Sequence, residues 1–172
     1  MRVLGIDPGY AIVGYGTVEY VNNKFYPVEF GAVTTQAHTP FEDRLKEVYD
    51  QLDVVIKRAQ PEAIAIEQLF FTTNQKTVIQ VAMARGVILL CAKNNNIPVF
   101  EYTPLQIKQS VAGYGKAVKK QVMEMTRLML KLDKVPKPDD TADALAVAIC
   151  HCHSYRSKLF GQNLGGQIRN GI

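Results

Sequence analysis

Val3-Leu4-Gly5-Ile6-Asp7-Pro8-Gly9, near the start of the 172-residue chain, is the stretch that determines the predicted fold. Its apolar residues predict a buried strand, and Pro8 with Gly9 ends that strand directly after Asp7. Aspartate is disfavoured in strands, and burying a carboxylate without a partner is costly. Asp7 therefore either starts the turn through a hydrogen bond to the backbone or has a function at the carboxyl end of the strand.

A second acid ends a second buried strand. Residues 63–66, Ala-Ile-Ala-Ile, are apolar throughout, as in a strand that is covered on both faces, and Glu67 follows them. In open sheets the carboxyl ends of the strands face the crevice in which ligands bind. We therefore expect Asp7 and Glu67 to lie at one edge of the same sheet.

The rest of the chain predicts an α/β fold. Two segments rich in β-branched and aromatic residues, joined at Asn22 and Asn23, form an antiparallel three-strand meander with the first strand. Helical periodicity then alternates with two more strands, which describes a mixed five-stranded sheet flanked by helices. The elements predicted after the first strand are strands 12–20, 24–34, 63–67 and 97–102, and helices 40–60, 75–94, 104–112, 118–132 and 139–155.

Several helices carry specific signals. Thr39 and Thr103 each precede a proline, with Glu42 or Gln106 three residues later, which predicts a capping box at both helix starts. Small residues in helix 75–94 indicate either tight packing within the chain or a subunit interface; they are Ala82, Ala84 and Gly86. In helix 118–132 the expected inward-facing residues are Val118, Val122, Met125, Leu128, Met129 and Leu132.

Length and composition indicate one globular domain. With 47% hydrophobic and 21% charged residues the chain is not disordered throughout. We expect one domain over residues 1–155 and a loosely ordered tail over 156–172, which is glycine-rich and has little periodicity. The longest apolar run, residues 86–92, is too short to cross a bilayer, and Asp7 interrupts any signal-peptide core. Three cysteines argue against a disulfide framework, so we expect a cytoplasmic protein without a membrane contact.

The positive charge is concentrated in one window. Residues 104–137 contain eight Lys or Arg against two Asp or Glu, whereas residues 1–103 contain nine against eleven. A patch of this kind suits a polyanion such as DNA, although a solvated helix face is the simpler alternative.

Three more acids stand at the start of the last helix, Asp139, Asp140 and Asp143. Asp140 and Asp143 are three residues apart, so they lie on one helix face. They could merely cap the helix and interact with its dipole. If they join Asp7 and Glu67, however, four like charges would converge and would need divalent cations to neutralise them.

The ligand chemistry of these four acids favours a hard cation. All the candidate donors are oxygen atoms, which suits Mg²⁺, with Mn²⁺ as a substitute. Two such ions, about 3.5–4 Å apart, would activate a water and stabilise the leaving oxygen of a phosphodiester. The basic window would then bind the phosphates.

Three motifs resemble those of the RuvC family of bacterial Holliday-junction resolvases, and they follow one another along the chain in the family's order. They are Gly5-Ile6-Asp7-Pro8-Gly9, Ile66-Glu67-Gln68-Leu69-Phe70 and Asp140-Thr141-Ala142-Asp143-Ala144-Leu145-Ala146, and the resemblance extends to about His153. It implies a ribonuclease-H-like fold, a homodimer and Mg²⁺-dependent paired nicking of four-way DNA junctions. It also implies ligatable 5′-phosphate and 3′-hydroxyl products, and cooperation with the RuvA–RuvB branch-migration complex.

The resemblance also implies roles for single residues. Asp7, Glu67, Asp140 and Asp143 match the family's metal-binding and catalytic acids, while Asp139 is an extra acid that we assign to capping. The DNA-contacting positions matched are Lys108, Lys119 and the aromatic Phe70, with Lys116 and Lys120 added because they are near in sequence. Phe70 is expected to contact unstacked bases, unless it and Phe71 both belong to the core.

Two other interpretations of the whole chain remain in view. An actin- or sugar-kinase-like ATPase also begins with Gly-Ile-Asp-x-Gly, but Pro8 and Tyr10 replace its small polar residues and the chain leaves no room for a second lobe. A junction-binding protein without catalysis would gain nothing from carboxylates next to phosphate.

The run from Cys150 to His153 resembles a zinc site only superficially, because consecutive helix residues point about 100° apart. We expect that run to serve helix packing.

Overall fold

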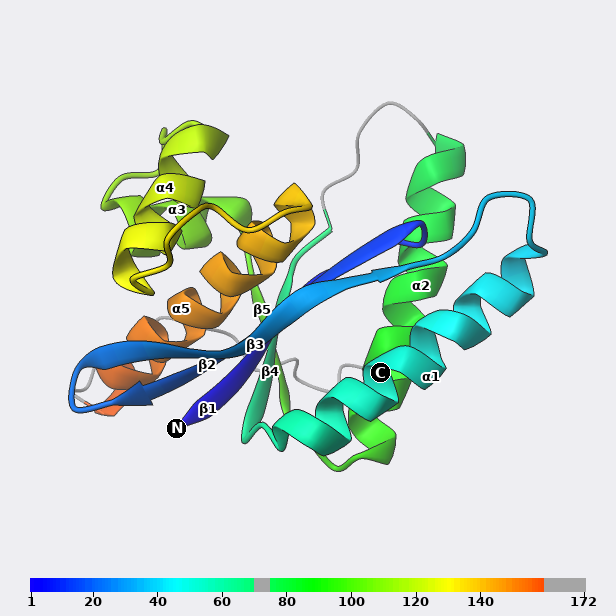
Figure 1. Ribbon diagram of the computed structural model, residues 1–172, viewed down its shortest axis with the longest axis horizontal. Coiled ribbons are helices and arrows are strands. Elements are labelled where there is room, and N and C mark those ends of the chain that lie inside the picture. The colour runs from blue at the N-terminus through cyan, green and yellow to red at the C-terminus, as the bar shows by residue number, and fades with distance from the viewer. Residues whose placement is uncertain (70–74, 160–172) are drawn as a thin grey trace.

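The structure is a computed structural model that describes residues 1–69 and 75–159. Its strands are β1 (Arg2–Asp7), β2 (Ile12–Val21), β3 (Lys24–Thr34), β4 (Ala63–Glu67) and β5 (Val99–Tyr102). Its helices are α1 (Phe41–Ala59), α2 (Gln75–Asn94), α3 (Pro104–Ala112), α4 (Lys119–Met129) and α5 (Asp139–Leu159). The strands form one sheet, in the order β3-β2-β1-β4-β5, between α1 with α2 on one face and α5 with α3 and α4 on the other (Figure 1).

The sheet is mixed, as the sequence predicted. β1, β2 and β3 form the antiparallel meander, and β4 and β5 extend the sheet in parallel with β1. Asn22 and Asn23 both have positive φ angles, 51° and 62°, which is the backbone conformation of a tight hairpin turn. The predicted fold class, a ribonuclease-H-like α/β fold with a five-stranded sheet, is confirmed.

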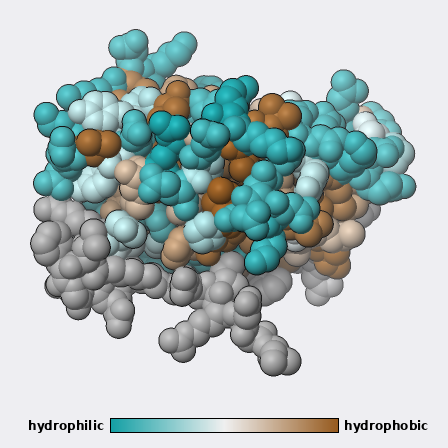
Figure 2. Space-filling model, turned by 90° about the horizontal axis from the view of Figure 1, so that it is seen from below, coloured by the Kyte–Doolittle hydropathy of each residue, from teal (hydrophilic) through white to brown (hydrophobic). Residues whose placement is uncertain are grey.

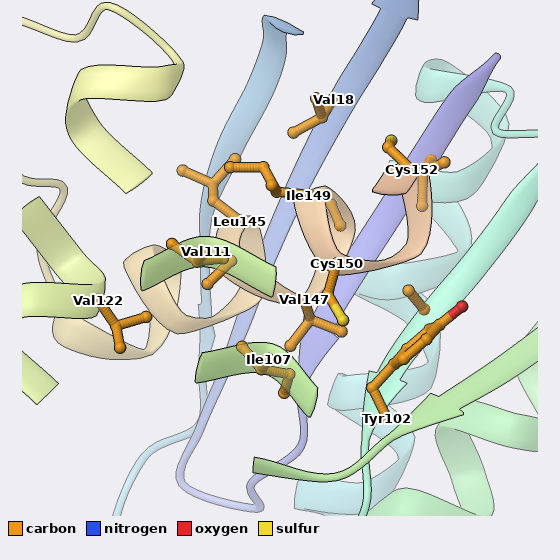
Figure 3. Packing of buried hydrophobic residues seen from close by; sticks show 14 of the residues in the cluster. Val18, Tyr102, Ile107, Val111, Val122, Leu145, Val147, Ile149, Cys150 and Cys152 are labelled. Atoms are coloured by element: carbon orange, nitrogen blue, oxygen red, sulfur yellow. The ribbon is translucent and has the colours of Figure 1, made fainter. Parts of the chain in front are cut away.

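Each face of the sheet has its own hydrophobic core. Leu4, Ile6 and Ile66 face α1 and α2, where Leu52 and Ile88 are fully buried. On the other face α5 is apolar nearly all round, and its side chains reach both the sheet and the α3–α4 layer (Figure 3). The members of this second cluster that Figure 3 labels are Val18, Tyr102, Ile107, Val111, Val122, Leu145, Val147, Ile149, Cys150 and Cys152.

Two glycines let α5 lie directly on the sheet. A Cβ atom at Gly5 would lie 2.0 Å from the Ala144 carbonyl oxygen, and one at Gly14 would lie 1.9 Å from the Asp140 carbonyl oxygen. Any larger residue would therefore push the helix off the strands. The close approach fixes the first turn of α5 over the ends of β1 and β2.

The two predicted capping boxes have different outcomes. Thr103 forms its box as expected, because its hydroxyl accepts from the Gln106 N–H at 3.2 Å and the Gln106 side chain accepts from the Thr103 N–H at 2.8 Å. The box at Thr39 is wrong. Helix α1 begins at Phe41, one residue later, and Pro40 in the cap position has no side chain that can accept a hydrogen bond.

The inward face predicted for α4 is also partly wrong. Val118, Met125 and Leu128 are exposed, by 60%, 38% and 51%, and the buried residues of the helix are Val122, Met123 and Thr126. Thr126 can be buried because its hydroxyl donates to the Val122 carbonyl at 2.8 Å. The buried face of α4 therefore includes a polar residue, Thr126, which hydrophobic periodicity could not identify.

Helix α2 combines a buried and an exposed side. Ala84 is fully buried, which confirms tight packing within the chain, but Ala82 is exposed and a Cβ at Gly86 would have no atom within 4 Å. By length and composition alone, Thr77–Asn94 is also apolar enough to cross a membrane. One such helix is weak evidence for a membrane segment, because α2 already packs on α1 and the sheet.

The C-terminal end is described only in part. Helix α5 continues to Leu159, beyond the predicted end near Tyr155. Residues 160–172 lie outside the described part of the chain, so the domain boundary and the loose tail stay predictions.

The face of the molecule in Figure 2 is mainly hydrophilic, with apolar side chains set among the polar ones.

Candidate active site

Asp7 and Glu67 are the last residues of two neighbouring parallel strands. Ile6 of β1 pairs with Ile66 of β4, so the two acids that follow lie side by side at the carboxyl edge of the sheet. Both side chains are half-buried. The structure thus brings these two acids together, as the sequence predicted from the strand ends.

The start of α5 supplies the remaining acids. Figure 1 shows the amino end of α5 close to the carboxyl ends of β1 and β4. Thr141 holds this helix end in place, because its hydroxyl donates to the Gly31 carbonyl of β3 at 3.0 Å. Asp140 in the first turn and Asp143 one turn further along come near enough to act electrostatically on Asp7.

The electrostatics of Asp7 show how closely the acids gather. Its pKa is raised from the usual 3.8 to about 8, first by burial and then by the charges of Glu67, Asp143 and Asp140, in that order. Lys119 is the group that lowers it. A carboxyl group in this setting is held protonated near neutral pH unless a cation joins it.

Glu67 and Asp143 respond in the same direction. Burial is the main reason that the pKa of Glu67 lies above its usual value, with the Asp143 charge second. Burial also raises the pKa of Asp143, although the ammonium of Lys119, 2.8 Å from Asp143 Oδ2, opposes that shift. Perturbed acids that gather in one crevice are a mark of a functional site rather than of helix capping.

Asp139 lies apart from this group. It is the first residue of α5 and pairs with Lys137 at 2.6 Å and with Lys119 at 3.9 Å, and these contacts lower its pKa, the hydrogen bond to Lys137 first. Its role in the structure is ion pairing rather than the capping that the sequence suggested.

Two cavities border the acids. One, of about 250 Å³, is lined by Glu67 and Asp143 together with Lys108 and Lys119. The other, of about 200 Å³, is lined by Asp7, Pro8 and Glu67, so Glu67 contributes to both. The arrangement places two lysines directly beside the carboxylates, where a phosphate would be attracted and the acids would need neutralisation.

The other predicted DNA contacts divide into three cases. Lys120 lines a cavity of about 560 Å³ with Lys119, on the α4 side of the acids. Lys116 is exposed in the connection between α3 and α4. Phe70 and the alternative Phe71 lie outside the described residues, so the aromatic contact stays a prediction.

The donor set fits a hard divalent cation in its chemistry. It consists of carboxylate oxygens whose charges are poorly tolerated without a counter-charge, as the raised pKa of Asp7 indicates. Among the side chains that the structure describes, no three His, Cys, Asp or Glu already lie close enough to hold an ion as they stand. Lys119 draws Asp143 to itself, so binding an ion would require this carboxylate to exchange partners.

The run from Cys150 to His153 serves packing, as predicted. Both cysteines are buried in the α5 core, and the two histidines point to different partners. Tyr102 Oη lies 2.8 Å from Nδ1 of His151, while Ser110 Oγ lies 2.9 Å from Nδ1 of His153. The four side chains therefore do not converge on one point.

One group of contacts at the site has no counterpart in the sequence predictions. Thr35 and Arg44 contact Tyr10, in the turn that follows Asp7. No local sequence motif indicates them, because the contacts join segments that are far apart in the chain.

Comparison with known proteins identifies the family. The model of the family described as crossover junction endodeoxyribonuclease RuvC matches residues 3–151 of the chain. The chain belongs to the RuvC family. It is thus a member of a family of hydrolases, the crossover junction endodeoxyribonucleases.

Its RuvC relatives match over nearly their whole length. The RuvC of Caldanaerobacter subterraneus subsp. tengcongensis is 57% identical over 154 residues, which cover 90% of this chain and 93% of the relative. The RuvC of Clostridioides difficile is 54% identical over 167 residues, covering 97% and 99%. The structure of Thermus thermophilus RuvC in complex with a Holliday junction substrate has a TM-score of 0.87 and 35% identity, and covers 92% of this chain and 96% of that one.

Proposed function

We propose that this RuvC family member resolves four-way DNA junctions by paired symmetric nicks, in DNA recombination and repair. The observation that carries the proposal is the convergence of Asp7, Glu67, Asp140 and Asp143, from three separate segments, beside two lysines at one edge of the sheet. Hydrolysis of the phosphodiester leaves a 5′-phosphate and a 3′-hydroxyl, which a ligase can rejoin.

The residues divide into two functional groups. Asp7, Glu67, Asp140 and Asp143 hold Mg²⁺, two ions per site, and Mn²⁺ can replace it. Bound ions supply Lewis-acid stabilisation of the phosphate oxygens and a water of lowered pKa. The protein contributes the fixed carboxylates, and Gly5 and Gly14 keep α5 close enough to the sheet to bring the acids together.

The lysines bind and orient the DNA strand. Lys108 and Lys119 line the same cavity as Glu67 and Asp143, so a phosphate that contacts these ammonium groups is adjacent to the acids. Lys120 and Lys116 continue the positive surface along the α3–α4 layer, and Phe70 is the proposed aromatic contact to unstacked bases. Phosphate contacts of this kind give affinity and position rather than sequence choice.

We further propose that the protein acts as a homodimer that is paired through α2. Ile79, Met83 and Leu90 are exposed by 60%, 49% and 54%, and their spacing places them on one side of the helix. A Cβ atom added at Gly86 on the same helix would have no atom within 4 Å, so a second helix can approach closely. A four-way junction has two equivalent strands to cut, and a two-fold dimer offers one active site to each.

The proposed dimer surface can be tested by introducing a charged residue into it. Leu90→Asp places a carboxylate within the proposed contact, and we expect monomers in sedimentation analysis. Val54→Asp on α1, a site 58% exposed in the structure, is the matched control and should leave the dimer intact. A dimeric Leu90→Asp protein would place the interface elsewhere.

Two further parts of the proposal rest on family membership. These are cooperation with the RuvA–RuvB branch-migration complex and action in the cytoplasm. Pull-down of purified RuvA–RuvB on a junction with this protein would test the first directly.

The activity is tested on synthetic four-way junctions. We expect symmetric nicks with Mg²⁺, none in EDTA, and little cutting of a linear duplex of the same sequence. ATP hydrolysis with intact junctions would instead favour the kinase-like ATPase, and tight junction binding without nicks would favour a binding protein.

A further inference from the structure

We propose that Thr35 and Arg44 are positioning residues, which fix the turn after Asp7 and thereby keep its carboxylate among the other acids. The inference rests on the proposed function, because it assumes that Asp7 is catalytic. It concerns contacts that join the end of β3 and the start of α1 to the β1–β2 turn (Figure 1).

The turn itself is tight and has little room for error. A Cβ atom at Gly9 would lie 2.0 Å from the Ile12 carbonyl oxygen, so the chain folds back closely on itself after Pro8. Asp7 pairs with Gly14 in the β1–β2 ladder and is the last residue before the turn. Any movement of the turn therefore changes the direction of the Asp7 side chain.

Thr35 holds the turn at two successive residues. Its hydroxyl donates to the Tyr10 carbonyl at 2.7 Å, and its backbone N–H donates to the Ala11 carbonyl at 3.0 Å. Thr35 is only 8% exposed, so these bonds are shielded from water. Buried bonds of this kind are costly to lose, because the turn carbonyl would then lack a partner.

Arg44 completes the network from α1. Its Nε donates to the Thr35 hydroxyl at 2.8 Å, which leaves the hydroxyl hydrogen for Tyr10. Its guanidinium carbon also lies 4.7 Å from the centroid of the Tyr10 ring, and Phe41 contacts the same ring edge-on at 5.8 Å. One arginine therefore holds both the side chain of Tyr10 and the residue that binds its carbonyl.

Arg44 acts through position rather than through its charge. The charges that shift the pKa of Asp7 are those of Glu67, Asp143, Asp140 and Lys119, and Arg44 is not among them. The network also explains Tyr10, which occupies a position where a kinase-like phosphate loop would carry a small polar residue. The ring serves as the surface on which Arg44 packs.

The experiment compares three substitutions that keep the acids and lysines intact. Thr35→Val removes the hydroxyl at nearly constant volume, Thr35→Ser restores it, and Arg44→Met removes the guanidinium. Arg58→Met is the matched control, because Arg58 also joins α1 to β3, through Glu29 at 2.6 Å, but near the other end of the helix. A merely structural role would make the two arginine variants alike.

We measure three quantities: the single-turnover nicking rate of a bound junction, the junction Kd, and amide hydrogen exchange of residues 10–12. Because small misplacement of a reacting group can cost about 100-fold in rate, we expect Thr35→Val and Arg44→Met to nick roughly 10–100-fold more slowly. The Kd should stay within about twofold, since the phosphate contacts remain, and exchange in the turn should accelerate. Thr35→Ser and Arg58→Met should resemble the unaltered protein in all three.

The inference would be overturned by wild-type nicking in both Thr35→Val and Arg44→Met, or by a loss of rate that Arg58→Met shares. If Thr35→Val does not fold, Arg44→Met carries the same comparison. Hydrogen exchange separates the inference from the proposed function, because it reports on the turn even in a protein that cuts no junction. Unchanged exchange in both variants would contradict the network directly.

Discussion

Lys119 Nζ lies 2.8 Å from Asp143 Oδ2, so the basic and acidic parts of the site are in direct contact. The lysine is the first residue of α4 and the acid is the fifth residue of α5. This pair joins the two proposed activities, DNA binding and cation binding, in one interaction. A phosphate and a divalent cation that enter together would each take one member of the pair.

Replacing Lys119 tests its double role. We expect Lys119→Met to lower the salt dependence of junction binding by about one unit in the slope of log K against log salt, because one phosphate contact is lost. Because the Lys119 side chain is 56% exposed, its loss should cost only about 0.5–1 kcal/mol of stability. Lys46→Met, on the exposed side of α1, is the control and should leave the slope unchanged. An unaltered slope in Lys119→Met would exclude a phosphate contact.

Asp7→Asn separates catalysis from folding. The amide has the shape of the carboxylate but not its charge, so we expect nicking to fall by about 10³-fold or more while the junction Kd changes little. Asp50→Asn, at an exposed acid of α1, should nick normally. Loss of both binding and nicking in Asp7→Asn would point to a folding defect instead.

The stability of the metal-free protein should decrease as the pH rises. Asp7 has a pKa of about 8 when folded and 3.8 when unfolded, so the folded state binds more protons between these values. The contribution of Asp7 to stability is therefore fully present below about pH 4 and is lost as the pH rises toward 8, by roughly 1–4 kcal/mol. Denaturant unfolding across this range in EDTA measures the fall, which Asp7→Asn should reduce and Mg²⁺ should oppose. A flat profile in EDTA would contradict the raised pKa of Asp7.

Close helix–sheet contact should be essential at Gly14. Gly14→Ala adds a Cβ atom 1.9 Å from the Asp140 carbonyl, so α5 must move. We expect a loss of roughly 1–3 kcal/mol in stability and slower nicking, because Asp140 moves with the helix. Gly86→Ala adds a Cβ in open space on α2 and should stabilise the free subunit by about 0.5–1 kcal/mol. Equal stability of the two variants would contradict the packing argument.

Much of the fold could be predicted from local pattern. The meander, the two acid-terminated strands and the Thr103 cap all have short-range signals, in alternation, turn residues and cap chemistry. Helix α4 could not be predicted as well, because its core stripe includes Thr126, whose hydroxyl is satisfied by its own helix. The capping box predicted at Thr39 was also wrong, because α1 begins at Phe41, one residue later than predicted.

The four acids could be proposed from the sequence, but the contacts that position them could not. Strand ends and helix spacing identify Asp7, Glu67, Asp140 and Asp143 as candidates. The Gly14 contact with α5 and the Thr35–Tyr10 bond depend on how distant segments pack, and neither glycine nor threonine has a sequence signal for such a role. Side-chain partners, such as that of Lys119, likewise follow only from the packed structure.

Direct titration of Mn²⁺ tests the central claim, that these acids form one cation site. We expect saturable binding at pH 8 in the unaltered protein and in Asp50→Asn, and strongly weakened binding in Asp7→Asn, Glu67→Gln and Asp140→Asn alike. Binding that is unchanged in all three site variants would show that the acids do not share cations, and the account of the active site would be wrong.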